Sequence, residues 1–186
     1  WIADYDGLVN RAESVGHSWR PAIVPIQRQQ YEQWIGEFLG PRHPELVPQL
    51  LAALDAFDAA IRSGVLTDKQ LLTIVECARS PRTPLGENVA ALLGELAARF
   101  PPAEEAVREM IAHPKIHTRI NALVAISSTS PTKLHDDVLR IALKDRSVKV
   151  RALSAEKVMH FGLDHLLPDL ERAIRRENNA KIRQGL

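Results

Sequence analysis

From about residue 101 onward, the same types of residue recur at intervals of 32 positions. Three sets of positions keep this spacing: Arg119, Arg151 and Arg183; Arg108, Arg140 and Arg172; and Glu105, Asp137 and Asp169. A period of roughly 20 to 50 residues that holds two short helices is typical of α-solenoids, in which a unit buries its apolar face only when the next unit stacks on it. The sequence therefore predicts an all-α protein, with stacked antiparallel helix pairs forming a right-handed solenoid over residues 44–186.

Between the Pro and Gly positions, apolar residues recur at helical spacing, with almost no alternation of the kind that predicts strands. Tyr31, Trp34 and Phe38 lie on one face of a first helix, which we expect to end before Gly40 and Pro41. Further helices are expected from about Leu46 to Gly64, from Asp68 after the capping-box pair Thr67 and Gln70 to about Arg79, and at about 86–99, 103–112, 116–127, 134–144, 148–160 and 165–177, with another starting near 180.

The segment from Lys144 to Ala155, Lys-Asp-Arg-Ser-Val-Lys-Val-Arg-Ala-Leu-Ser-Ala, resembles the signature of HEAT repeats, in which an acidic turn precedes a Val-Arg pair and a helix with small residues. The stretch 166–174 is similar to the second helix of such a unit, and Ile182-Arg183 is similar to the next Val-Arg pair. The resemblance covers 113–186 and extends back to about residue 44. It implies a curved scaffold that binds partners on its surface. Stacking would bury seven apolar residues between units: Leu143, Val150, Leu153, Val158, Leu166, Leu170 and Ile174.

Residues 1–43 lack the repeat and form a separate, aromatic-rich N-terminal segment with one expected helix. This segment holds all three Trp, both Tyr and Phe38. A solenoid needs a terminal unit that covers its open apolar edge, so we interpret the segment as a cap. The alternative is an aromatic cluster that grips a ligand, because Arg11, Arg20 and Arg28 lie among the aromatic residues. At the other end, a new repeat begins at Ile182 without its second helix, and the repeat domain is expected to be truncated there.

The charge is nearly balanced over the chain, with 24 Lys and Arg against 23 Asp and Glu, but residues 133–186 hold 12 basic and 8 acidic side chains. This modest excess falls short of the concentrated basic surface expected of a nucleic-acid-binding protein, although it permits an anionic partner. An acidic residue precedes the Arg by three positions in each of the pairs that end in Arg108, Arg140 and Arg172. These pairs are either local ion pairs or a row of cations about 10 Å apart that binds an acidic partner.

The second interpretation gives five candidate partner-binding residues: Arg108, Arg140, Arg172, Arg175 and Arg176. Arg175 and Arg176 are included because no acidic residue lies three positions before either of them. The other Arg set has a different expected role. Arg119, Arg151 and Arg183 lie one turn into the outer helices, where a guanidinium can reach the acidic turn residue of its own or the adjacent unit, so their role is architectural.

No pattern in the sequence predicts a catalytic, cofactor-binding or metal site. His113 and His117 have the spacing of two metal ligands, but Pro114 lies between them and no carboxylate completes a tetrahedral set. Cys77 lies in an apolar helix without a neighbouring basic group and is expected to be a core thiol. The single Cys and the lack of a secretion signal predict a cytoplasmic protein. The sequence contains no apolar stretch of about 18 residues, so it predicts no membrane span.

The expected function is therefore that of a non-catalytic protein–protein interaction module or scaffold, whose partner carries an acidic surface. One alternative is a nucleic-acid-binding HEAT-like protein such as a DNA glycosylase that removes alkylated bases. Those enzymes resemble this chain in fold type, but they carry aromatic residues in a basic groove, whereas every Trp here precedes the repeats. A second alternative is a small-ligand or lyase-type HEAT protein. The oligomeric state stays open.

Overall fold

The computed structural model describes residues 24–127 and 129–176, and this part of the chain contains helices and no strand. The elements, in order, are α2 (Val24–Trp34), the π-helix η1 (Ile35–Leu39), α3 (Gly40–Arg42), the 3-10 helix η2 (Pro44–Leu46), α4 (Val47–Ser63), α5 (Asp68–Ala78), α6 (Thr83–Ala97), α7 (Pro101–Ile111), α8 (Ile116–Ser127), α9 (Lys133–Ala142), α10 (Val148–His160), the 3-10 helix η3 (Asp164–Leu166) and α11 (Leu167–Arg176). The all-α prediction is confirmed for these residues. The helix expected near 180 and the aromatic residues before position 24 lie outside them.

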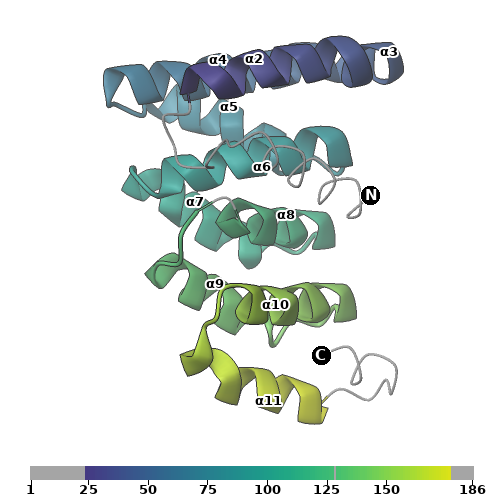
Figure 1. The fold of residues 1–186 in the computed structure, drawn as a ribbon, viewed down its shortest axis with the longest axis vertical. Coiled ribbons are helices and arrows are strands. Elements are labelled where there is room, and N and C mark those ends of the chain that lie inside the picture. The colour runs from purple at the N-terminus through teal and green to yellow at the C-terminus, as the bar shows by residue number, and fades with distance from the viewer. Residues whose placement is uncertain (1–23, 128, 177–186) are drawn as a thin grey trace, which may run out of the picture.

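From α4 to α11, consecutive helices pack against each other, and each of α4 to α8 also packs against the helix after the next. The even-numbered helices α4, α6, α8 and α10 contact one another in sequence, and so do α5, α7 and α9. The helices thus form two layers that run side by side along the long axis of the molecule (Figure 1). Helix α2 packs against α4 at one end of this arrangement, and α11 lies at the other end.

The helix boundaries follow local signals where the sequence carries them. Thr67 and Gln70 form the expected capping box, in which the Thr67 N–H donates to Gln70 Oε1 at 2.8 Å. Gly64 ends α4 with a φ of 69°, a conformation that favours glycine. The first helix differs from the prediction, because it continues past Pro41 to Arg42. The π-helix widens the hydrogen-bond ladder, so that the Gly40 N–H donates to the Ile35 carbonyl oxygen. Pro41 then lies in the first turn of α3, where its missing N–H is tolerated.

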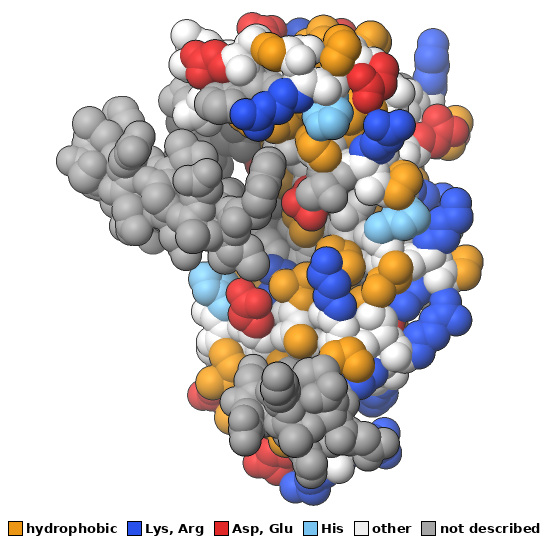
Figure 2. Space-filling view, turned by 90° about the vertical axis from the view of Figure 1, so that its right-hand side faces the viewer, with side chains coloured by type: hydrophobic (Ala, Val, Ile, Leu, Met, Phe, Trp, Pro, Cys, Tyr) orange, Lys and Arg blue, Asp and Glu red, His pale blue; other side chains and the backbone are white. Residues whose placement is uncertain are grey.

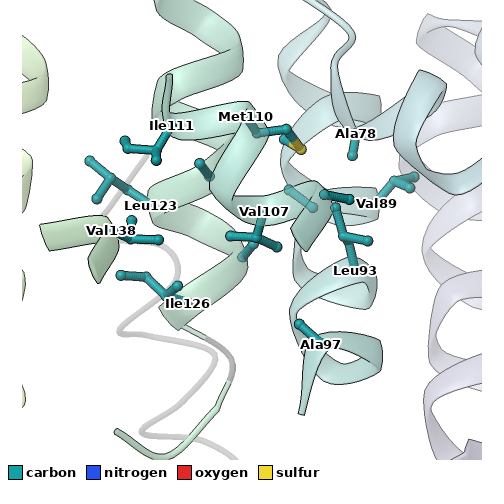
Figure 3. Close-up of a cluster of buried hydrophobic side chains, with 14 of the residues drawn as sticks. Ala78, Val89, Leu93, Ala97, Val107, Met110, Ile111, Leu123, Ile126 and Val138 are labelled. Carbon is teal, nitrogen blue, oxygen red and sulfur yellow. The ribbon is translucent and has the colours of Figure 1, made fainter. Parts of the chain in front are cut away.

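The apolar core runs through the arrangement between the two layers rather than forming one central cluster. Figure 3 shows its middle part, where Val107 of α7 lies beside Leu93 of α6, and Leu123 of α8 lies with Val138 of α9. Five of the seven residues expected between units are buried: Leu143, Val150, Val158, Leu166 and Leu170. Leu153 and Ile174 are only partly buried. They lie on α10 and α11, and no further described helix covers the outer side of these two.

Helices α6 and α8 approach each other closely, and Gly94 permits it. A Cβ atom at Gly94 would lie 2.7 Å from the carbonyl carbon of Ala125, and would overlap the carbonyl oxygen of that residue. Asn121, one turn before Ala125 on α8, donates to the carbonyl oxygens of Ala78 at 2.7 Å and Ser80 at 3.2 Å. The backbones of α6 and α8 therefore meet at Gly94 with no side chain between them, and the Asn121 side chain links α8 to the end of α5.

We expect Gly94→Ala to destabilise the protein by roughly 1 to 3 kcal/mol, because the added methyl group forces α6 and α8 apart. Gly36→Ala is the matched control, since nothing lies within 4 Å of a Cβ at Gly36. This control should change stability by less than about 1 kcal/mol. Chemical denaturation of both variants measures the difference. Equal stabilities would contradict the close approach of the two helices.

His135 joins the start of α9 to the end of α8, and its side chain is fully buried. The Thr132 N–H donates to its Nδ1 atom at 3.0 Å, and its Nε2 atom lies 2.7 Å from the Ile126 carbonyl oxygen. The ring is therefore neutral, with its proton on Nε2. Burial lowers the pKa of His135 below its ordinary value.

This lowered pKa makes stability depend on pH in a defined direction. The unfolded chain binds a proton at His135 as the pH falls through roughly 6.5, whereas the folded chain does not until a lower pH. The thermal midpoint should therefore fall as the pH is lowered from about 7 to about 5. His135→Gln keeps an acceptor for the Thr132 N–H, as Gln70 does for Thr67, and should have a shallower slope over this range. An equal slope in both proteins would contradict the neutral, buried imidazole.

Candidate functional site

Arg119 joins two consecutive repeats through a buried ion pair. Its Nε and Nη2 atoms donate to the two carboxylate oxygens of Asp145 at 2.6 Å and 3.0 Å. Its Nη1 atom donates to the carbonyl oxygens of His113 at 2.9 Å and Pro114 at 2.8 Å. Both charged side chains are about one-twentieth exposed, at 5% and 6%. The architectural role expected for Arg119 is confirmed, because one guanidinium holds the turn before α8 and the turn before α10.

The same contact recurs one period later. Arg151 donates from Nη1 to the Asp145 carbonyl oxygen at 2.8 Å, as Arg119 does to the carbonyl oxygen of His113. Arg151 and Asp145 each lie 32 positions after Arg119 and His113, so this hydrogen bond recurs with the period of the sequence. Arg183, the third member of this set, lies outside the described residues.

The structure places Arg108, Arg140 and Arg172 on α7, α9 and α11 and links them to acidic residues across the repeats. Arg108 donates to Asp137 at 3.0 Å, and Arg140 donates to Asp169 at 2.7 Å. In both cases the acidic partner belongs to the following repeat. These bridges are a contact that the sequence reasoning did not anticipate, because it considered only acidic residues on the same helix.

The pairs expected within one helix form to different extents. Arg172 donates to Asp169 at 2.7 Å, whereas Arg108 Nη1 lies 3.8 Å from Glu105 and donates mainly to Glu104. Among the described residues no ion pair joins Asp137 and Arg140. The carboxylate of Asp169 is 4% exposed and is shared by Arg140 and Arg172, so one negative charge faces two guanidinium groups.

The other two candidate cations differ from each other. Arg175 Nη1 lies 3.4 Å from Glu171, one turn earlier on α11, in a pair that is about two-thirds exposed. Sequence reasoning missed this partner because it examined only the position three residues before Arg175. Arg176 forms no ion pair with any residue in the described ranges.

Two hollows lie on the surface beside the turns that Arg119 and Arg151 hold. Hollow A, with a volume of about 600 Å³, is lined by Arg119, Arg140, Ile141, Lys144, Asp145 and Arg146, among others. Hollow B, with a volume of about 460 Å³, is lined by Lys144, Asp145, Arg151, Asp169, Arg172 and Arg176, among others. Hollow A is shallow and open, and hollow B is more enclosed. Lys144 and Asp145 border both hollows.

The two hollows are copies of one site, displaced by the period of the sequence. Arg119, Arg140 and Lys144 of hollow A correspond to Arg151, Arg172 and Arg176 of hollow B, each 32 positions later. Two of the five candidate residues, Arg172 and Arg176, therefore lie together in hollow B, and Arg140 lies in hollow A. Arg108 and Arg175 line neither hollow. Lys144 was missed, although the spacing of Lys144 and Arg176 could have revealed a fourth periodic set.

Both hollows are positively charged because their carboxylates are already engaged. Asp145 is held by Arg119, and Asp169 is held by Arg140 and Arg172. Lys144 and Arg176 have no ion-pair partner within the part of the chain that the structure describes. In Figure 2, Lys and Arg side chains gather along the right-hand edge of the middle and lower parts of the molecule. The arrangement can attract and orient an anionic group, since guanidinium groups match the geometry of carboxylate and phosphate oxygens.

Cys77 and His113, the side chains considered for catalysis or metal binding, contact backbone groups. Burial raises the pKa of the Cys77 thiol, and its Sγ atom lies 3.7 Å from the Gln49 carbonyl oxygen. The Nδ1 atom of His113 accepts the Lys115 N–H at 3.1 Å. Within residues 24–127 and 129–176, no three His, Cys, Asp or Glu side chains are grouped so that they could hold a metal ion. No helix in the same ranges has both the length and the apolar character needed to cross a bilayer.

No protein-family model matches this chain, and no curated protein or solved structure matches it significantly.

Proposed function

We propose that this chain is a HEAT-like, right-handed α-solenoid that acts as a non-catalytic protein-interaction scaffold in the cytoplasm. Its partner is a protein with an acidic segment, which binds across hollows A and B. The fold part of this proposal is supported by the period of 32 in both the sequence and the Arg contacts. It is also supported by the two layers of helices, in which each repeat packs on the next.

The observation that carries the binding proposal is the repetition of one basic site. Lys144 and Arg176 occupy equivalent positions, and neither forms an ion pair with another described residue. Two cations that recur at the period of the fold and form no ion pair with a described residue can bind an anionic ligand without breaking such a pair. Consecutive repeats stack at roughly the helix-packing distance of 8 to 10 Å, so the two sites suit a ligand that carries more than one negative charge.

A protein partner fits the hollows better than a nucleic acid does. No Phe, Tyr or Trp is among the residues that line hollow A or hollow B. Proteins that bind single-stranded nucleic acids, and enzymes that extrude a base, stack bases on such side chains. The alternative of a DNA glycosylase therefore lacks its main support at this site. A nucleic-acid ligand remains an outcome of the experiment below.

The experiment reverses the two cations that carry the proposal. Lys144→Glu combined with Arg176→Glu should weaken binding of a fluorescent oligoglutamate peptide by at least about tenfold, a change of about 1.4 kcal/mol. Because neither side chain makes an ion pair with a described residue, the thermal midpoint and the helicity by circular dichroism should stay close to those of the parent. The matched control is Lys69→Glu combined with Lys133→Glu, which changes the net charge equally, lies outside both hollows and likewise breaks no ion pair between described residues.

Two results would contradict the proposal. The first is equal weakening in both double variants, which would show that the peptide responds to net charge alone. The second is tighter binding of a single-stranded oligonucleotide of matched charge than of the peptide, at both about 50 mM and about 200 mM salt, which would favour the nucleic-acid alternative.

A further inference from the structure

Hollows A and B have three cations at equivalent positions but differ in their floors. Ile141 in hollow A corresponds to Ala173 in hollow B, and Ala112 corresponds to Lys144. Ile141 is 45% exposed, whereas Ala173 is 7% exposed. The period therefore repeats three cations of the site but not its apolar surface.

Hollow A offers an apolar floor with a cationic rim. Ile141 lies there with Ile111, Ala112 and Pro114, and these four side chains come from two consecutive repeats. Arg140, Lys144 and Arg146 border the same hollow. Arg146 is itself fixed, because its Nη2 atom donates to the Pro114 carbonyl oxygen at 2.5 Å. An aliphatic side chain placed against Ile141 would lose contact with water without separating any ion pair.

Hollow B is also lined by cations, but it lacks the apolar floor of hollow A. Lys144, Arg151, Arg172 and Arg176 surround it, and its two carboxylates are engaged by Arg119, Arg140 and Arg172. The apolar residues that line it are Leu143, which is 2% exposed, and Ala173. Little apolar surface is thus open to a ligand in hollow B, and an acidic group is the complementary occupant.

We propose that the two hollows together bind one extended segment of a partner protein, with an aliphatic side chain on Ile141 in hollow A and acidic side chains in hollow B. This inference rests on the proposed function and specifies the chemistry of the partner. Hollows one repeat apart are separated by roughly 8 to 10 Å, and an extended chain advances about 3.3 Å per residue. The aliphatic side chain and the first acidic side chain are therefore about three residues apart in the partner.

A double-mutant cycle between protein and peptide tests this arrangement. The probes are two short fluorescent peptides, one with a leucine about three residues from a run of glutamates and one with serine in place of the leucine. Fluorescence anisotropy measures the affinity of each peptide for the parent, for Ile141→Ser and for the control Met159→Ser. Met159 is 62% exposed on α10 and lines neither hollow. Met159→Ser therefore also replaces an exposed apolar side chain by serine, but outside the proposed site.

The parent and Met159→Ser should bind the leucine peptide roughly five- to tenfold more tightly than the serine peptide, as expected for one aliphatic side chain that leaves water. In Ile141→Ser this ratio should fall to about one, because the leucine has lost its contact. An unchanged ratio in Ile141→Ser would overturn the inference. If the reversal of Lys144 and Arg176 still weakened both peptides, the proposed function would stand without it. Failure of both peptides to bind the parent would overturn the inference and the proposed function together.

Discussion

The ion pair between Arg119 and Asp145 is the interaction on which the position of the last two described repeats depends. Removing one partner of such a buried pair leaves an uncompensated charge and costs about 3 to 5 kcal/mol. Asp145 also accepts the N–H of Ser147 at 2.7 Å, at the residue that precedes α10. One carboxylate therefore fixes the start of a helix and its distance from the repeat before it. Because Asp145 lies on the border between hollows A and B, the same contact sets their shape.

Charge in this part of the molecule is divided between residues that hold the fold and residues that are open to a ligand. Arg108 and Arg140 each reach an acidic residue of the next repeat, and these bridges neutralise much of the row that they form. Lys144 and Arg176 lie one turn beyond Arg140 and Arg172 and make no such bridge within the described residues. The proposed ligand would therefore not have to break an ion pair between described residues in order to contact Lys144 and Arg176.

The sequence was sufficient to predict the all-α class, the capping box at Thr67 and the role of Arg119, because each follows from spacing along the chain. It could not decide how Arg140 pairs. With a period of 32, an acidic residue three positions before each Arg is also 29 positions after the Arg of the previous repeat. Pairing within one helix and pairing with the next repeat therefore give the same sequence pattern. Only the direction of the Arg side chain distinguishes the two. The π-helix Ile35–Leu39 is a local widening of the hydrogen-bond ladder, and no residue type specifies it.

The central claim is that one guanidinium holds two consecutive turns and so sets the geometry of the repeated site. Amide hydrogen exchange in the parent and in Arg119→Met tests this claim most directly. The account predicts faster exchange in the variant in two places, with no change in α4. The first is the turn at 113–115, where the guanidinium binds the carbonyl groups of His113 and Pro114, and the second is the turn at 143–147, where it binds the carboxylate of Asp145. Faster exchange confined to the first of these turns, or no change in either, would contradict it.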